Sequence, residues 1–358
     1  MAGSSDAARK PSRRTRNVAT IYDVAARAGV SKMTVSRVVN GEGYVTAEKR
    51  DLVLQAVRDL QYMPNPAARS LASADAARVG VLYNNPSAAY FGEFLVGALE
   101  AASQNGVQLI LERCETGDPA AARAAVRKLI KGGLAGMVLP SPVCESSELI
   151  DDLKRSGVSV VAIATGRFCG EASCVRIDEI RAAGEMTRFL LGLGHRRIGF
   201  IKGHPDHSAS AARYSGFEQA MADAGLKVDP ALVVQGYFSH ASGNDAAELL
   251  LSRKKMPTAI FASNDDMASA AVAVAHRRGL EVPGDLSVVG YDDTAMAVAV
   301  WPQLTTIRQP IAAIGRNTLD LIARDIRSRR SGEAIAPADY VVPHVLIERK
   351  SAAAPRSA

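Results

Sequence analysis

From residue 78 onward, short apolar runs alternate with amphipathic segments long enough to form helices. The apolar runs are Val79–Tyr83, Val107–Leu111, Gly136–Leu139, Ser159–Ala164, Ile198–Ile201, Thr258–Ala262 and Leu286–Tyr291. Apolar residues recur at helical spacing in the segments between them, as in Phe94–Gln104, Ala120–Lys131, Arg181–Leu193, Ser210–Ala224 and Asp266–Arg278. Such alternation predicts parallel sheets with helices on both faces. The units are too many for one open sheet, so we expect two α/β lobes.

The chain before residue 78 has a different pattern. Residues 1–18 are rich in Ala, Ser and Arg and lack apolar periodicity, which predicts a disordered basic arm. Residues 19–63 carry apolar side chains at i, i+3 and i+4 spacing in three groups, which predicts three short helices. Pro64 and Pro66 end this run. We therefore predict an all-α headpiece at 19–63, a hinge and linker at 64–77, the two lobes at 78–349 and a tail at 350–358.

Composition and charge narrow the class of protein. The chain has 358 residues, 47% hydrophobic and 22% charged, which is typical of a globular protein with two or three domains. We find no apolar run of membrane-spanning length, no secretory signal and no metal-ligand spacing, and the cysteines lie scattered at Cys114, Cys144, Cys169 and Cys174. We expect a reduced, cytoplasmic compartment and inert buried thiols. Most of the net charge of +6 falls within the first 75 residues, which favours a polyanionic partner there.

Residues Thr20–Asn40 have the pattern of two helices joined by a tight turn. Gly29 suits the turn, and Ser31 is a good N-cap for the second helix. The valines of the second helix point inward, which leaves four side chains on its outer face near the N-terminus: Lys32, Met33, Ser36 and Arg37. A helix placed in this way meets base edges, and Arg37 can donate to guanine or to phosphate. The alternative is a plain helical hairpin with a solvated charged face; the glycine, the cap and the donors favour DNA reading.

A second, shorter helix candidate follows the prolines. Asn65 can cap a helix that begins at Pro66 and spans only two turns, to Ser73. A helix shorter than about 12 residues is marginal in water, so this one should order only when something supports it. Leu71, its one bulky apolar side chain, can enter a minor groove as a wedge. It can equally pack on a lobe as part of a linker, and the residues alone leave both possibilities open.

Polar side chains gather where the predicted strands of the lobes end, and ligands of open α/β sheets bind in that place. They are Asn84, Asn85, the loop from His204 to His207, Arg213, Asn264, Asp265 and Asp292. Aromatic faces are available at Tyr90, Phe91, Phe238 and Trp301. Carboxylates, amides and a guanidinium around aromatic rings can bind polyhydroxyl rings by hydrogen bonds and stacking. The sequence therefore predicts a small-molecule site between the lobes.

Motifs along nearly the whole chain resemble the lactose-repressor family of bacterial transcription regulators. They are Tyr22–Ala25, Ala28–Ser31, Thr34–Asn40, Tyr62–Leu71, Gly194–Ile198, Arg213–Phe217, Ser263–Ala268, Ser287–Asp293 and Leu304–Pro310. The resemblance covers about residues 20–349. It implies a helix-turn-helix headpiece, a hinge helix that inserts Leu71 into the operator's minor groove, and a two-lobed effector domain like the periplasmic sugar-binding proteins. It also implies a homodimer on double-stranded palindromic operator DNA.

The resemblance also implies roles for individual residues. The implied DNA contacts are Thr20, Tyr22, Ser31, Lys32, Met33, Thr34, Ser36, Arg37, Asn40, Asn65, Ala68 and Leu71. The implied effector contacts are Tyr90, Phe91, His207, Arg213, Phe238, Asn264, Asp265 and Asp292. Ala164 departs from the pattern, because many members have an aspartate there. A sugar or glycoside is the expected effector; the Tyr90-Phe91 pair resembles the purine-responsive members and leaves a purine or other heterocycle as the alternative.

Two other functions fit parts of the sequence. A transport-type sugar-binding protein would carry a signal peptide and no DNA-reading headpiece. A glycosidase could use Asp292 and Asp293 as its carboxylate pair, but no nucleophile–base pair or metal motif accompanies them. We therefore expect a repressor controlled by a small molecule, without enzymatic activity, cofactor or metal. No leucine heptads follow Arg349, so we expect a dimer rather than a tetramer joined by a zipper.

Overall fold

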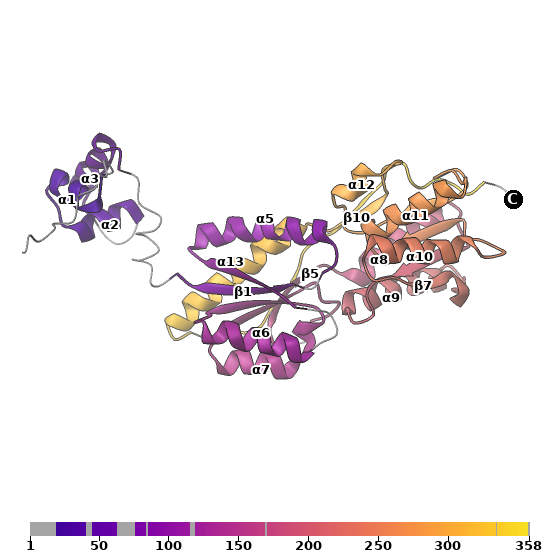
Figure 1. Cartoon of the computed structure of the whole chain (residues 1–358), viewed down its shortest axis with the longest axis horizontal. Helices are drawn as coiled ribbons and strands as arrows, with labels where there is room; N and C mark the ends of the chain where they lie inside the picture. Colours follow the sequence, from indigo (N-terminus) through magenta and orange to yellow (C-terminus); the bar gives the residue numbers. More distant parts are fainter. Residues whose placement is uncertain are drawn as a thin grey trace, which may run out of the picture. The chain divides into compact units, whose positions relative to one another are not determined.

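The computed structural model describes residues 19–40, 45–62, 76–83, 85–114, 119–168, 170–333 and 335–356. The chain divides into two compact units, Met1–Ala76 and Ala77–Ala358 (Figure 1). The predicted arm at 1–18 lies outside the described residues, as do Asn65, Ala68 and Leu71 of the predicted hinge. Among the described helices, none is long and apolar enough to cross a membrane.

The first unit contains the three predicted helices. They are α1 (Ile21–Ala28), α2 (Lys32–Asn40) and α3 (Ala47–Asp59). Each helix contributes one fully buried valine to a common core: Val24, Val35 and Val53. The apolar spacing read from the sequence therefore predicted this small all-α fold correctly.

The second unit begins with a lobe, here called the N-lobe, built on a six-stranded sheet in the order β11-β5-β4-β3-β1-β2. The strands are β1 (Arg78–Tyr83), β2 (Gln108–Arg113), β3 (Gly136–Pro140), β4 (Ser159–Ile163), β5 (Ser173–Arg176) and β11 (Asp339–Val341), and every pair is parallel. One face is covered by α5 (Ala88–Asn105) and α13 (Ile311–Arg330), and the other by α6 (Pro119–Lys131) and α7 (Ser147–Arg155) (Figure 1).

The C-lobe is built on a smaller parallel sheet in the order β7-β6-β8-β9. Its strands are β6 (Ile198–Lys202), β7 (Val233–Gln235), β8 (Ala259–Ala262) and β9 (Ser287–Val289). Its helices are α8 (Glu179–Gly192), α9 (Ser208–Asp223), α10 (His240–Leu251), α11 (Asp265–Arg277) and α12 (Ala295–Ala299). A separate antiparallel pair joins β10 (Thr306–Arg308) to β12 (Val345–Ile347). Two lobes with parallel sheets confirm the predicted fold class.

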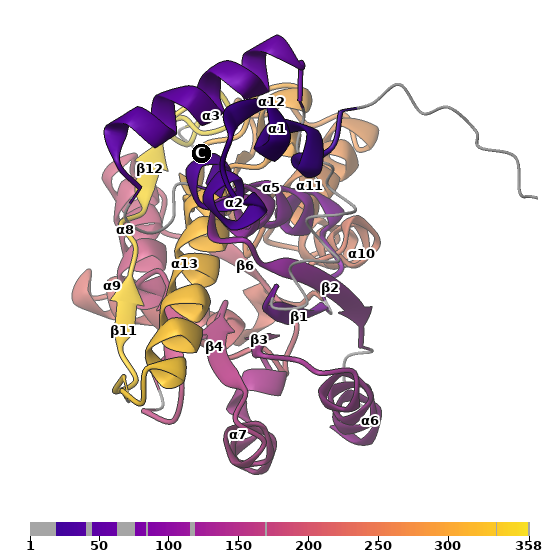
Figure 2. The same cartoon turned by 90° about the vertical axis from the view of Figure 1, so that its left-hand side faces the viewer.

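The chain passes between the lobes three times, from β5 to α8, from β10 to α13 and from β11 to β12. For this reason α13 and β11, from the last part of the chain, lie against N-lobe elements from its first half (Figure 2). Both sheets are parallel, so the loops after their strands lie at the carboxyl edges where the polar residues were predicted.

Glycines allow the helices of each lobe to pack closely. A Cβ on Gly97 of α5 would lie 1.8 Å from the backbone oxygen of Ala312 in α13. A Cβ on Gly216 of α9 would lie 2.2 Å from the backbone oxygen of Ile180 in α8. Both distances are shorter than any real carbon–oxygen contact, so a larger residue would push the helices apart. The second contact places the start of α8 beside α9.

Several elements were not indicated by the sequence pattern. They are β5, β7, β10, β11, β12, α7, α10, α12 and α13. The five strands hold only three or four residues each, which is too few for a period of two to stand out. The predicted run Leu286–Tyr291 is a strand only over Ser287–Val289.

Candidate functional site

The first helix of the headpiece begins with a capping box. The backbone N–H of Asp23 donates to Thr20 Oγ1 (3.4 Å), and the backbone N–H of Thr20 donates to Asp23 Oδ2 (2.8 Å). Hydrogen bonds from the Thr20 side chain and backbone hold the pKa of the Asp23 carboxyl below its usual value. Thr20, a predicted DNA contact, thus also fixes the start of α1.

The turn between α1 and α2 has the predicted geometry. Gly29 has a φ of 65°, in the left-handed region that glycine adopts without strain. The backbone N–H of Thr34 donates to Ser31 Oγ (3.2 Å), so Ser31 caps α2 as expected. The Ser31 and Thr34 hydroxyl oxygens lie 3.0 Å apart. These bonds orient the first turn of α2.

The outer face of α2 combines cations with large exposed apolar groups. Lys32 and Arg37 are exposed, and Met33 keeps 62% of its surface exposed. Tyr22 of α1 is 65% exposed, and the Lys32 ammonium lies 5.6 Å from its ring centroid. Ser36 is half-buried beside them. Cationic and hydroxyl donors can contact base edges, and exposed apolar groups beside them can contact thymine methyl groups. The side chain of Asn40 lies outside the described residues.

A pocket of about 340 Å³ lies between the two lobes. Its lining is Asn85, Tyr90 and Ala164 from the N-lobe, and His207, Ala209, Arg213, Phe238, Asn264 and Asp292 from the C-lobe. Six of the eight predicted effector residues therefore lie around one space. Of the other two, Phe91 lines an adjoining space and Asp265 is buried away from the pocket.

The Arg213 guanidinium is 5% exposed and is held by Glu179, which was not predicted. Arg213 Nε donates to Glu179 Oε2 (2.8 Å) and Nη2 donates to Oε1 (3.2 Å), while Nη1 donates to the backbone oxygen of Ser263. The guanidinium lies 3.8 Å from the centroid of the Tyr291 ring, and the Tyr291 hydroxyl donates to Glu179 Oε2. Burial opposes the charged form, yet the Glu179 carboxylate raises the pKa of Arg213 above its usual value.

Asn264 and Asp292 lie on the same side of the pocket. Asn264 Oδ1 accepts from the backbone N–H of Met267 (3.0 Å), and Nδ2 donates to the backbone oxygen of Phe238 (2.9 Å). Asp292 Oδ1 accepts from Gln309 Nε2 (2.6 Å) and lies 3.8 Å from Arg213 Nη1. Burial raises the pKa of the Asp292 carboxyl well above its usual value. A carboxyl group has further hydrogen-bonding capacity beyond these contacts, so Asp292 can also bind a ligand.

Three residues that line the pocket have positive φ without being glycine. They are Ala164 (54°), Phe238 (60°) and Asp292 (109°). Such backbone conformations cost about 1–3 kcal/mol each, and they cluster where function requires a particular geometry. This backbone strain could not be predicted from the residue pattern. Its clustering around the pocket supports the pocket as a functional site.

His207 is buried in the pocket wall with a free ring nitrogen. It is 5% exposed, and within the described part of the chain its Nε2 has no hydrogen-bond partner. Its ring meets that of Phe238 edge to face, with 5.7 Å between the centroids. Burial, together with His204 and the positive charge of Arg213, lowers the pKa of His207 to about 4. A neutral imidazole facing a pocket can donate to a ligand or accept from it.

An aromatic annex of about 360 Å³ adjoins this pocket on the N-lobe side. Phe91 lies there, stacked on Tyr83 with 4.5 Å between the ring centroids and 6.4 Å from the ring of Phe94. Tyr90 and His207 line both spaces. The annex therefore offers flat apolar surface directly beside the polar groups.

Asp265 and Trp301, both singled out from the sequence, line neither space. Asp265 is buried, and its carboxylate accepts from the backbone N–H of Thr294 (2.8 Å) and from Thr306 Oγ1 (2.7 Å). It fixes the segment after β9 instead of facing the pocket, and burial raises its pKa to about 7. Trp301 is 77% exposed and lines neither the pocket nor the annex. Asn84 lies outside the described residues.

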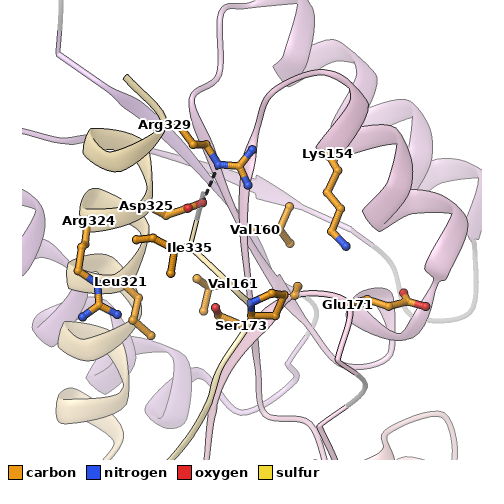
Figure 3. A pocket seen from close by; sticks show the side chains of 12 residues that line it. Lys154, Val160, Val161, Glu171, Ser173, Leu321, Arg324, Asp325, Arg329 and Ile335 are labelled. Atoms are coloured by element: carbon orange, nitrogen blue, oxygen red, sulfur yellow. Dashed lines mark hydrogen bonds and ion pairs between the residues drawn. The ribbon is translucent and has the colours of Figure 1, made fainter. Parts of the chain in front are cut away.

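A further pocket, of about 470 Å³, lies within the N-lobe between α13, β4 and the start of β5 (Figure 3). Its charged lining residues are Lys154, Glu171, Arg324, Asp325 and Arg329. Arg329 pairs with Asp325 (2.9 Å), as Figure 3 shows. The lining mixes both signs of charge and holds none of the predicted residues, so we place the candidate effector site between the lobes.

The buried imidazole of His207 makes a pH-dependent contribution to stability. Its folded pKa of about 4 lies below the unfolded value near 6.5, so the unfolded chain binds more protons between these pH values. The wild type is therefore expected to lose up to about 3 kcal/mol relative to His207→Gln between pH 7 and pH 4. Urea denaturation at several pH values measures this. His276→Gln, an exposed site on α11, serves as the control, and equal pH slopes for both variants and the wild type would contradict the assignment.

Comparison with known proteins agrees with this arrangement. Residues 20–65 match the bacterial regulatory proteins of the lacI family, and residues 187–352 match a periplasmic binding protein-like domain. The purine repressor PurR of Klebsiella pneumoniae (strain 342) is 34% identical over 94% of this chain and 97% of its own length.

Two solved structures resemble the whole molecule. One is the transcriptional regulator CelR in complex with cellobiose, with a TM-score of 0.68 and 30% identity over 93% of this chain and 99% of that one. The other is the lac repressor dimer bound to operator and the anti-inducer ONPF, with a TM-score of 0.71 and 26% identity over 94% and 100%. With a DNA-reading headpiece, two periplasmic-binding-protein-like lobes and these relatives, the chain belongs to the lacI family and is a DNA-binding transcriptional regulator.

Proposed function

We propose that this regulator is a repressor whose affinity for operator DNA is set by a small molecule bound between its lobes. The observation that carries the proposal is the pocket in which Arg213, Asn264 and Asp292 meet His207 and two aromatic rings. A concave site with a few convergent polar groups is the form that small-molecule sites take. In a DNA-binding regulator, such a pocket has an evident use as a sensor.

We propose a sugar or glycoside as the first candidate ligand. Asp292 and His207 can accept from hydroxyl groups, and an arginine can donate to them. Phe238, 6% exposed in the pocket wall, offers a face on which a sugar ring can stack. The resemblance to CelR in its cellobiose complex supports the same class.

A purine or other heterocycle is the second candidate. The stacked rings of Tyr83 and Phe91 in the annex favour a flat aromatic ligand, because offset stacking adds to the free energy of apolar burial. The 34% identity to a purine repressor supports this alternative. The two classes differ in where they would sit: a sugar beside Arg213 and Asp292, a purine against the annex.

For the DNA side, we propose that a homodimer reads a palindromic operator. The outer face of α2 (Lys32, Met33, Ser36 and Arg37) would contact the major groove, together with Thr20, Tyr22, Ser31, Thr34 and Asn40. Asn65, Ala68 and Leu71 of the hinge at 64–77 would contact the minor groove. Ligand binding would change the angle between the lobes, and with it the separation of the two hinges. Separated hinges cannot pair, so they lose their helix and release the operator.

A ligand screen tests the proposal directly. Thermal shift of the full-length protein against sugars, glycosides and purines detects binding, because a ligand stabilises the folded state by mass action. Each compound that raises Tm is then tested for its effect on operator binding by fluorescence anisotropy at fixed salt, since phosphate contacts make affinity strongly salt-dependent. If no compound that binds changes operator affinity, the proposed control does not exist.

Leu71→Ala is expected to weaken operator binding by on the order of tenfold or more while leaving ligand affinity intact. The reason is that the wedge would be lost from the minor groove, whereas the pocket lies in the lobes. Fluorescence anisotropy with operator DNA measures the operator affinity, and calorimetry with a ligand found in the screen measures the ligand affinity. A matched control is Ser70→Ala, which keeps the length of the hinge and its leucine. Equal losses of both affinities would contradict the assignment.

We propose that the carboxylates after β9 do not perform glycoside hydrolysis. Asp293 pairs with Arg308 (2.7 Å) and Arg349 (2.6 Å), and Asp292 accepts from Gln309. A glycosidase pair needs one carboxylate on each side of the scissile bond, and neighbours in one loop held by separate partners suit this poorly. Turnover of chromogenic glycosides above the blank would overturn the proposal.

A further inference from the structure

Glu179, the first residue of α8, neutralises the cation of the candidate effector site. It is 3% exposed and grips Arg213 through both carboxylate oxygens, at 2.8 and 3.2 Å. The Tyr291 hydroxyl donates to the same carboxylate. Glu179 does not itself line the pocket, so it acts on a ligand only through Arg213. A two-point contact of this kind is the strongest pairing that an arginine makes.

Within the part of the chain that the structure describes, the pocket carries no uncompensated positive charge that would attract an anion. Arg213 is the only cationic side chain among the described residues that line it. Against this one positive charge stands the Glu179 carboxylate, which contacts it directly. The buried carboxyl of Asp292, whose Oδ1 lies 3.8 Å from Arg213 Nη1, is a second acidic group beside the guanidinium. His207 adds no positive charge at neutral pH, because burial lowers its pKa to about 4. An incoming anion therefore meets an arginine whose charge is already compensated.

We propose that Glu179 is a specificity-determining residue that restricts the site to uncharged or cationic ligands and excludes phosphorylated and carboxylated ones. The inference rests on the proposed function, since it takes the pocket between the lobes to be the effector site. It admits neutral sugars, glycosides, amino sugars and free purine bases, and it excludes sugar phosphates, sugar acids and nucleotides. The proposal thus restricts both candidate ligand classes, the sugars and the purines, to their members without negative charge.

The physical reason is that buried charges act on one another with little screening. An anion brought beside Arg213 would also approach Glu179 and Asp292, and it would have to leave water to do so. Asp292 already illustrates the cost: burial raises the pKa of its carboxyl although Arg213 lies nearby. A hydroxyl or ammonium group, by contrast, can donate to Asp292 and add no negative charge.

The test uses inorganic phosphate as the probe on the full-length protein, with chloride at equal ionic strength as the reference. The wild type is expected to show no Arg213-dependent thermal stabilisation by phosphate. Glu179→Gln frees the guanidinium, so phosphate affinity should rise by on the order of tenfold or more. Adding Arg213→Gln to that variant should abolish the gain. Glu185→Gln serves as the matched control, because Glu185 lies on the same helix and pairs with Arg181 and His344 instead.

Two results would overturn the proposal. The first is Arg213-dependent binding of phosphate by the wild type with an affinity as high as that of Glu179→Gln. The second is a folded Glu179→Gln protein whose phosphate affinity is no higher than that of the wild type. If Glu179→Gln does not fold, the wild-type protein is tested by itself. Its affinity for glucose is compared with that for glucose 6-phosphate, and its affinity for adenine with that for adenosine monophosphate. Arg213-dependent binding of either anion more tightly than its neutral partner contradicts the exclusion, and absence of such binding supports it.

The proposed function fails in a different way. If no compound alters operator binding, the regulator is not controlled through this pocket. The phosphate affinity of Glu179→Gln still tests the charge proposal, because that measurement does not depend on operator binding. If an anionic compound binds in the pocket and releases the operator, control by a small molecule holds and the charge rule is wrong.

Discussion

Arg213→Met in the full-length protein is expected to lower the free energy of unfolding by about 3–5 kcal/mol and to abolish the response to any ligand of the pocket. The loss is large because the substitution leaves the carboxylate of Glu179 buried without its cation, at 3% exposure. Operator affinity of the folded protein should stay close to that of the wild type, since the headpiece forms a separate compact unit. Urea denaturation and anisotropy measure the two effects.

A double-mutant cycle separates the two roles of Arg213. Adding Glu179→Gln to Arg213→Met removes the stranded charge, so about 1–3 kcal/mol of stability should return while the ligand response stays lost. Arg181→Met is the matched control, because its pair with Glu185 (3.0 Å) is exposed and exposed pairs contribute less than about 1 kcal/mol. If Arg213→Met costs no more stability than Arg181→Met, the buried pair does not stabilise the C-lobe as argued.

The broad architecture could be predicted because it depends on patterns within short windows. The alternation of apolar runs and helical segments predicted both parallel sheets, and the spacing around Gly29 and Ser31 predicted the turn and cap that the structure contains. The short strands β5 and β7 could not be predicted, because they hold only four and three residues. Such lengths are too short for an alternating pattern of apolar and polar side chains to stand out.

The candidate site was predictable only in part, and for a related reason. Residues that follow the ends of strands, such as Asn264 after β8 and Asp292 after β9, are placed by the rule that parallel strands end at one edge. Glu179 could not be found in this way, because its role arises from the close approach of α8 to α9 that Gly216 allows. Asp265 shows the opposite failure: it follows Asn264 directly, but the first turn of α11 directs its carboxylate to Thr306.

The headpiece alone, as a fragment of residues 1–62, is expected to bind the operator about 10²–10⁴-fold more weakly than the full-length protein. Within the described residues it has its own core around Val24, Val35 and Val53, so it keeps the exposed face of α2. It lacks the hinge and the lobes through which the proposed dimer joins two headpieces. The second half-site must then be bound from free solution instead of at the high effective concentration that a linked partner provides.

Anisotropy at fixed salt on an operator obtained by selection from random DNA measures the loss, and circular dichroism shows whether the fragment is folded. Arg37→Ala in the fragment is the internal control: a further loss of affinity means that the remaining binding still uses the outer face of α2. Suppose instead that the folded fragment binds as tightly and as selectively as the intact chain. Neither the hinge nor the lobes would then contribute to DNA binding, and a ligand between the lobes would have no route by which to release the operator.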